Sequence, residues 1–134
     1  MALNALERSE LLRESKTVAI VGISDKPERA SYGVAQYLLE NSHYEIFFVN
    51  PLLDEVLGKK VYKSLKELPA HIDIVDVFRK PADCLGVLAE SIEVSAGAIW
   101  LQLGIDVPEV ESKGIEAGLN VVMDRCIKID HAAL

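Results

Sequence analysis

The residues most suited to binding a ligand lie directly after a short apolar run, Val18–Val21. Gly22 ends that run, a polar loop containing Lys26 and Arg29 follows, and a helical pattern begins at Ser31. This order of strand, glycine turn, loop and helix is typical of open α/β sheets, which bind ligands at the carboxyl ends of their strands. Free N–H groups at a helix N-terminus favour anions there. The stretch therefore indicates a phosphate-bearing ligand above Gly22, although a glycine that only makes a tight turn explains it equally well.

The loop departs from the dinucleotide fingerprint, which places glycines at its first, third and sixth positions. Those positions are Gly22, Ser24 and Pro27, so two of the glycines are missing. A site for NAD also uses an acidic residue at the end of the second strand to bind the ribose hydroxyls. Asn50, followed by Pro51, stands at that place. Both departures count against NAD and leave another phosphate-bearing ligand open.

Four cationic residues are candidates for phosphate contacts: Lys26, Arg29, Arg79 and Lys80. Arg79 stands where a predicted strand ends, at the expected binding edge. For Arg79, ligand contact and a solvated surface charge are equally good interpretations. For Lys80, a solvated surface charge is the better one.

The overall charge excludes some classes of partner. The 134 residues carry a net charge of −7, which argues against a nucleic-acid partner because phosphate backbones require a basic face. No apolar stretch approaches the length of a membrane span, and three glutamates within 1–15 argue against a signal peptide. Cys84 and Cys126 are far apart without metal-ligand spacing, which favours reduced thiols in a cytoplasmic protein without a metal site.

The candidate residues are positioned by a regular alternation of strands and helices. Five apolar runs predict strands over Thr17–Ile23, Tyr44–Val49, Ile72–Phe78, Ala98–Leu103 and Leu119–Met123. Because crossovers between parallel strands are right-handed, we expect an α/β fold with a doubly wound, five-stranded parallel sheet in three layers. Its expected strand order is 3-2-1-4-5, Rossmann-like, in a single domain over 1–134. Val61 and Tyr62 indicate a short extended piece, and Asp73 and Asp76 are expected near an end or an edge.

Capping residues predict where the helices begin and end. Asn4 with Glu7, and Ser64 with Glu67, have the spacing of capping boxes. The predicted helices cover about 4–14, 31–40, a short stretch at 64–67, a segment that Pro81 starts and Gly97 caps, and 106–118. The remainder, 124–134, is predicted to be a short tail with one helical turn.

Several motifs together resemble a known family. They are Val21-Gly22-Ile23-Ser24 with Pro27, Arg29 and Ser31-Tyr32, then Val49-Asn50-Pro51, Val77-Phe78-Arg79, Trp100-Leu101-Gln102-Leu103-Gly104-Ile105, and Val122 to Lys128. In this order they resemble the small bacterial and archaeal CoA-binding proteins, which are stand-alone relatives of the N-terminal CoA-binding domain of the succinyl-CoA synthetase α subunit. The resemblance covers about 16–134. One departure is Ala30, where the family often has proline.

The resemblance implies that CoA lies across the carboxyl edge of the sheet. The implied cofactor-binding residues are Gly22, Ser24, Asp25, Lys26, Arg29, Ser31 and Tyr32 around the phosphates, Asn50 and Pro51 beside the adenosine, Phe78 and Arg79 in the cleft, and Trp100, Leu101 and Gln102 on the pantetheine side. The synthetase has a second domain with a phosphorylated histidine, and this sequence has no counterpart of it.

No catalytic constellation is evident. His43, His71 and His131 are separated in predicted turns or the tail, and no serine or cysteine is visibly paired with them. Arg125 could activate Cys126, which could then form a mixed disulfide with CoA. Pairing of Arg125 with Asp124, beside a packed thiol, is the better interpretation.

The sequence therefore favours a module that binds CoA or an acyl-CoA without evident catalysis of its own. An enzyme acting on NADP or an acyl-CoA is one alternative. A regulatory or interaction protein with a vestigial nucleotide pocket is the other.

Overall fold

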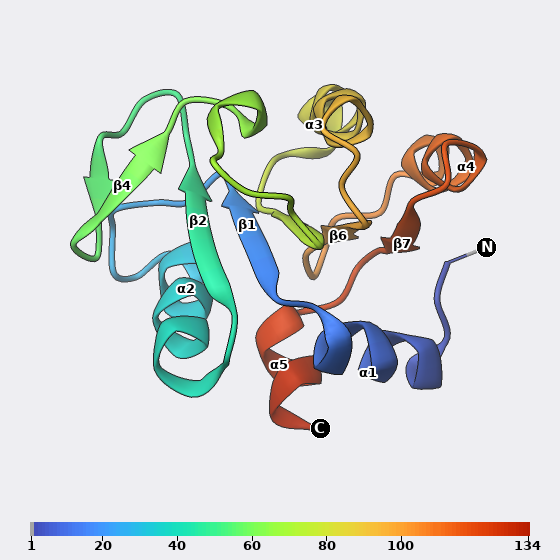
Figure 1. Ribbon diagram of the computed structural model, residues 1–134, viewed down its shortest axis with the longest axis horizontal. Coiled ribbons are helices and arrows are strands. Elements are labelled where there is room, and N and C mark those ends of the chain that lie inside the picture. The colour runs from blue at the N-terminus through green and yellow to red at the C-terminus, as the bar shows by residue number, and fades with distance from the viewer. Residues whose placement is uncertain (1) are drawn as a thin grey trace.

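The computed structural model describes residues 2–134, so Met1, which belongs to the expected single domain, lies outside the described residues. At its centre is a seven-stranded sheet in the order β3-β4-β2-β1-β5-β6-β7 (Figure 1). The strands are β1 (Thr17–Val21), β2 (Glu45–Val49), β3 (Glu55–Val56), β4 (Lys59–Tyr62), β5 (Ile74–Val77), β6 (Ala98–Leu101) and β7 (Asn120–Val122). Every neighbouring pair is parallel except β3 and β4, which are antiparallel. The expected α/β, Rossmann-like fold is confirmed.

The expected number and order of strands were wrong. The prediction of five strands missed β3 and did not count β4 as a strand, because Val56 and Val61 are their only buried residues and neither segment forms an apolar run. The short extended piece predicted at Val61 and Tyr62 is confirmed, since both residues lie in β4. The order 3-2-1-4-5 placed the strand of Ile72–Phe78 beyond the one of Tyr44–Val49. In the structure β5 pairs with β1, and β4 occupies the place beside β2.

Helices cover both faces of the sheet and make the three expected layers. Figure 1 shows α1 (Ala5–Glu14), α2 (Ala30–Asn41) and α5 (Ile127–Ala132) on one face, and α3 (Pro81–Glu93) and α4 (Pro108–Glu116) on the other. A 3₁₀ turn, Leu65–Glu67, joins the second face. None of the helices within 2–134 has both the length and the apolarity that crossing a membrane requires.

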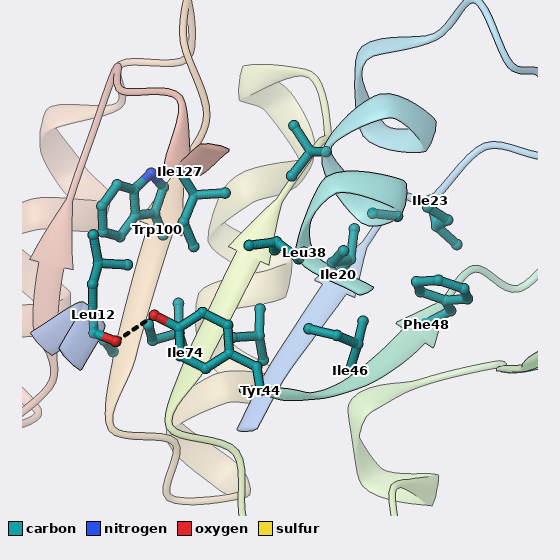
Figure 2. Close-up of a cluster of buried hydrophobic side chains, with 14 of the residues drawn as sticks. Leu12, Ile20, Ile23, Leu38, Tyr44, Ile46, Phe48, Ile74, Trp100 and Ile127 are labelled. Atoms are coloured by element: carbon teal, nitrogen blue, oxygen red, sulfur yellow. Dashed lines mark hydrogen bonds between the residues drawn. The ribbon is translucent and has the colours of Figure 1, made fainter. Parts of the chain in front are cut away.

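The side chains of the central strands alternate between two hydrophobic clusters. In β1, Val18 and Ile20 face α1, α2 and α5, whereas Ala19 and Val21 face α3 and α4. Figure 2 shows the first cluster, in which the Tyr44 hydroxyl donates a hydrogen bond to the Leu12 carbonyl oxygen. Burial raises the pKa of Tyr44 to about 12. Strands covered on both faces read as continuous apolar runs, which is why the sequence predicted them.

The helix ends follow the predicted signals in part. The capping box of α1 is confirmed, because the Glu7 N–H donates to Asn4 Oδ1 at 2.8 Å and the Asn4 N–H to Glu7 Oε1 at 3.0 Å. Pro81 begins α3 as predicted. Gly97 does not cap that helix. The left-handed position after α3 belongs to Ser95, with φ 57°, and a Cβ at Gly97 would lie 2.9 Å from the Asp73 carbonyl oxygen.

The two aspartates of the third predicted strand have different surroundings. Asp73 precedes β5 and accepts hydrogen bonds from the N–H groups of Lys16 and Thr17, as a position at a strand end allows. Asp76 also lies near a strand end, one residue before the end of β5, but it is not exposed there. It is completely buried in β5, in register with Ile20 and Trp100 on the neighbouring strands. Neither of its carboxyl oxygens has a hydrogen-bond partner within 2–134, and burial raises its pKa well above the usual value.

Candidate functional site

A cavity of about 550 Å³ opens at the carboxyl ends of β1, β5 and β6, between the start of α2 and the start of α5. This volume lies in the range of small-molecule sites. The cavity is lined by Gly22, Ser24, Lys26, Arg29, Ala30, Ser31, Val34, Phe78, Arg79, Gln102, Leu103, Ile105, Cys126 and Ile129. It therefore lies at the edge where the sequence predicted a ligand.

Gly22 is required by the backbone of the turn that follows β1. Its φ of 89° is one that glycine adopts readily. A Cβ at this position would overlap the Phe78 carbonyl oxygen and lie 2.9 Å from Cδ of Arg79. Gly22 therefore makes the tight turn that the sequence indicated, whether or not a ligand lies above it. The absence of a side chain also lets the end of β5, with Phe78 and Arg79, approach the loop after β1.

Two serine hydroxyls hold the loop between β1 and α2. The Ser24 N–H donates to Ser31 Oγ at 3.0 Å, and the Lys26 N–H donates to Ser24 Oγ at 3.1 Å. Each hydroxyl thus accepts one backbone hydrogen bond and keeps its own O–H for a ligand. The N-terminus of α2 has neither a side-chain cap nor an acidic residue in its first turn. These groups together provide hydrogen-bond donors suited to phosphate.

The charged side chains of the lining are all cationic. Lys26 and Arg29 are exposed and form no ion pair within 2–134. The guanidinium of Arg79 donates from Nη2 to Asp83 Oδ2 at 3.0 Å, which fixes its position while leaving its other N–H groups available. Lys80 is exposed and does not line the cavity. The lining thus contributes three cationic side chains and no acidic one, with Arg79 paired to Asp83 outside the lining.

The end of the cavity near β6 and α5 is apolar apart from Gln102. Gln102 is only 4% exposed, and its Oε1 accepts a hydrogen bond from the Ile127 N–H at 3.1 Å. That bond orients the amide and leaves Nε2 without a partner within 2–134. Leu103, Ile105, Cys126 and Ile129 complete this end. Leu103, Ile105 and Ile129 were not among the predicted site residues. Leu103 and Ile105 belong to one of the motifs that carry the family resemblance, whereas Ile129 had no signal beyond its place in the tail.

Six of the predicted site residues lie outside the cavity lining: Asp25, Tyr32, Asn50, Pro51, Trp100 and Leu101. Trp100 and Leu101 are completely buried within β6, and the Trp100 indole N–H donates to the Arg125 carbonyl oxygen at 2.8 Å. Both side chains pack in the core, because β6 is covered on both faces. Asp25 is exposed, and Tyr32 packs against the first hydrophobic cluster.

Asn50 and Pro51 lie at the end of β2, beside the cavity rather than in its lining. The Asn50 amide donates from Nδ2 to the Ile23 carbonyl oxygen and accepts from the Leu52 N–H, both at 2.8 Å. Pro51 lines a separate cavity of about 110 Å³, whose wall also includes Arg79 and Lys63. Arg79 therefore borders both hollows.

The three histidines form their hydrogen bonds away from the cavity. His43 and His71 bond to the carbonyl oxygens of Ser15 and Ser95, and His131 Nδ1 lies 2.9 Å from the Tyr37 hydroxyl. None of these histidines lines the cavity. No group of three or more His, Cys, Asp or Glu residues in the described part of the chain is arranged to hold a metal ion.

The expected pairing of Arg125 with Asp124 was wrong. The Arg125 guanidinium donates two hydrogen bonds to Asp130, each 2.7 Å long, whereas Asp124 accepts from the Gly104 N–H at 2.6 Å. Both Cys84 and Cys126 are free thiols. Cys84 is buried, and that burial raises the pKa of its thiol.

Comparisons with known proteins identify the family. A family model described as a CoA binding domain matches residues 16–132. The uncharacterized protein YneT of Bacillus subtilis (strain 168) is 44% identical over 126 residues, which cover 94% of this chain and 93% of that protein. The solved structure of a hypothetical protein from Pyrococcus horikoshii OT3 is 38% identical with a TM-score of 0.93, covering 98% of this chain and 92% of that one.

A shorter match links the chain to a larger enzyme. The alpha subunit of the ADP-forming acetate–CoA ligase II of Pyrococcus furiosus is 37% identical over 57 residues, or 42% of this chain and 12% of that subunit. The resemblance predicted from the motifs is thus confirmed. With a family model that spans most of its length, this chain belongs to the family of CoA-binding domains.

Proposed function

We propose that this chain binds coenzyme A in the cavity at the carboxyl edge of the sheet. The observation that carries the proposal is the lining of that cavity, to which Lys26, Arg29 and Arg79 bring positive charge and no described acidic residue brings negative charge. CoA carries a pyrophosphate and a 3′-phosphate. Hydrogen bonds from cationic side chains to phosphate are among the stronger ones in proteins. Membership of the CoA-binding family supports the same ligand.

The loop after β1 provides the donors for the pyrophosphate. In this proposal the hydroxyls of Ser24 and Ser31 and the first N–H groups of α2 donate to the phosphate oxygens. Lys26 and Arg29 neutralise their charge from the loop, and Arg79 does so from the end of β5. Because these groups come from two separate segments, the loop that leads into α2 and the end of β5, a phosphate between them has donors on more than one side.

The two ends of CoA lie on either side of this loop in the proposal. Asn50 and Pro51, at the end of β2, border the adenosine. Gln102, at the end of β6, faces the pantetheine, and its free Nε2 can donate to one of the pantetheine amide carbonyls. Adenosine and pantetheine thus extend in opposite directions along the edge of the sheet.

CoA is favoured over NAD because of what stands at the end of β2. NAD sites use a carboxylate there to bind free ribose hydroxyls, and a carboxylate repels the added phosphate of CoA. Asn50 carries no charge, and both functions of its amide are used by the fold. This arrangement lacks the usual ribose anchor of NAD and leaves a phosphorylated ribose free of repulsion.

Isothermal titration calorimetry tests the proposal. We expect CoA to bind more tightly than 3′-dephospho-CoA, NADP or NAD. Because one charge-assisted hydrogen bond is typically worth about 1.5–3 kcal/mol, Arg29→Ala and Arg79→Ala should each weaken CoA binding about tenfold to a hundredfold. Arg13→Ala is the matched control, since Arg13 lies exposed on α1 outside the cavity and should leave the affinity unchanged.

Three results would contradict parts of the proposal. Tighter binding of NAD than of CoA would overturn the choice of ligand. Failure of all four ligands to bind would favour a vestigial pocket. CoA binding that neither arginine variant weakens would overturn the assigned phosphate contacts.

We further infer a role in binding without catalysis, in a single domain located in the cytoplasm. The engagement of all three histidines outside the cavity supports binding rather than chemistry. The single continuous sheet with one hydrophobic cluster on each face supports one domain. The free thiols of Cys84 and Cys126 support a reducing compartment.

A further inference from the structure

Two large hydrophobic side chains at the apolar end of the cavity are mostly exposed. Leu103 is 65% exposed and Ile129 is 61% exposed, although both line the same hollow. Ile105, half-buried, and Cys126 lie beside them. Hydrophobic side chains gathered at one wall of a concave site are a common feature of small-molecule sites. This end therefore suits a ligand group that is itself apolar.

The apolar end is continuous with the cationic end of the same cavity. Along the carboxyl edge of the sheet, Gly22 follows β1, Phe78 follows β5 and Gln102 follows β6. These three strands are neighbours, so the span from the first to the third is about 10 Å. A ligand with phosphates beside the first loop and an elongated arm along this edge reaches the apolar end with the tip of that arm.

The distribution of charge restricts what the tip can be. The three charged residues of the lining, Lys26, Arg29 and Arg79, come from the loop after β1 and the end of β5. The residues contributed by the segments after β6 and by α5 are Gln102, Leu103, Ile105, Cys126 and Ile129, and none of them is charged. A carboxylate placed beyond Gln102, among Leu103, Ile105 and Ile129, would lose hydration without gaining a cationic partner from the lining.

Resting on the proposed binding of CoA, we infer that the apolar end binds the acyl group of an acyl-CoA, and that this group is an uncharged aliphatic chain. Gln102 lies at the boundary, and its amide nitrogen, which has no partner within 2–134, is available to a carbonyl of the arm. Leu103, Ile105 and Ile129 cover the chain beyond it. Covering the chain removes from water both its own surface and that of the exposed leucine and isoleucine.

Calorimetry with four ligands of graded tip chemistry tests this inference on the full chain. The ligands are CoA, acetyl-CoA, butyryl-CoA and succinyl-CoA, of which the last two both carry four-carbon acyl groups. Each buried CH₂ group strengthens binding about fourfold. We expect butyryl-CoA to bind at least about tenfold more tightly than acetyl-CoA. Succinyl-CoA should bind no more tightly than CoA, because its carboxylate would enter the apolar end.

Variants at the two exposed residues test the location. Leu103→Asn and Ile129→Asn should each reduce the preference for butyryl-CoA over acetyl-CoA to less than about threefold. Because both side chains are largely exposed, these variants are expected to fold, and their melting temperatures check this. The matched control is Leu6→Asn, since Leu6 is 67% exposed on α1 outside this cavity and should keep the full preference.

The outcomes separate this inference from the proposed function. Equal affinities for butyryl-CoA and succinyl-CoA, or no gain over acetyl-CoA, would overturn the inference while CoA binding stands. An unchanged preference in both asparagine variants would overturn the assigned location. If none of the four ligands binds, the proposed function fails and the inference fails with it.

Discussion

Asp76 is the residue whose surroundings conflict most with its chemistry. Its carboxyl group is completely buried between Ile20 and Trp100 and has no hydrogen-bond partner within 2–134. Burial of a carboxyl group without a partner disfavours its ionised form, so its pKa lies well above the usual value. Above the usual carboxyl pKa this side chain opposes folding, because the folded chain holds the proton more tightly than the unfolded chain does.

The sign of this effect gives a prediction. The contribution of Asp76 to the free energy of unfolding is most favourable below the usual carboxyl pKa and falls as pH rises toward its raised value. Over that interval one proton changes stability by at most about 1.4 kcal/mol per pH unit. Asp76→Asn should be the more stable protein at pH 7 and should lose this part of the slope. Urea unfolding between pH 4 and 8, roughly spanning the interval from the usual carboxyl pKa upward, measures both effects.

The comparison needs a carboxylate that is not buried. Asp106 is exposed, and Asp106→Asn should keep the pH dependence of the wild-type protein. If the free energy of unfolding depends on pH in the same way for the wild type and Asp76→Asn, the pKa of Asp76 is the same in the folded and unfolded chains, and the prediction is wrong.

At the scale of elements, the turn between β1 and α2 leaves the least room for a side chain among the glycine positions. Gly22 combines φ 89° with a Cβ position that the Phe78 carbonyl oxygen occupies. We expect Gly22→Ala to lower the free energy of unfolding by at least about 2 kcal/mol, since backbone strain and steric overlap add. Gly86→Ala is the control, because Gly86 lies within α3 with open space around its Cβ position. It should stabilise by about 1 kcal/mol, and equal effects of the two variants in urea unfolding would contradict the assignment.

The elements that could be predicted are those whose burial or end signals appear in their own short stretch of sequence. The strands covered on both faces form apolar runs, and α1 and α3 begin at recognisable capping or proline signals. The hairpin of β3 and β4 was predicted only as an extended piece at Val61 and Tyr62, because it buries only Val56 and Val61. The strand order was wrong because the side of β1 on which a later strand pairs depends on the path of the crossover. No local pattern encodes that path.

The site could be predicted well in the loop, where the motifs fix the path of the backbone. It could be predicted less well in the strands and helices, where a side chain can point either into the core or toward the ligand. The loop residues Ser24, Lys26 and Arg29 do line the cavity, as does Gln102. The Trp100 side chain does not line the cavity, because it lies within a strand that is covered on both faces. Ile129 was missed because it belongs to a short helix whose docking beside α2 is a tertiary contact.

At the scale of the whole molecule, the proposed site joins parts that are distant in sequence. The loop after β1, the ends of β5 and β6, and α5 all contribute to one cavity. A ligand that requires this whole arrangement binds only the folded chain. Its binding free energy therefore adds to the free energy of unfolding.

This linkage gives a prediction that needs no labelled ligand. At a CoA concentration of about 100 times its Kd, the free energy of unfolding should rise by about 2.7 kcal/mol, which raises the Tm by roughly 5–10 °C for a chain of this size. Differential scanning calorimetry measures the shift. Arg29→Ala should show a smaller shift at the same CoA concentration, and Arg13→Ala should show the full one. Inorganic pyrophosphate at the same concentration separates specific binding from a general effect of anions on an acidic protein. Because pyrophosphate engages only the cationic end, it should raise the Tm by less than half as much as CoA, and an equal shift would show that the adenosine and pantetheine ends contribute nothing.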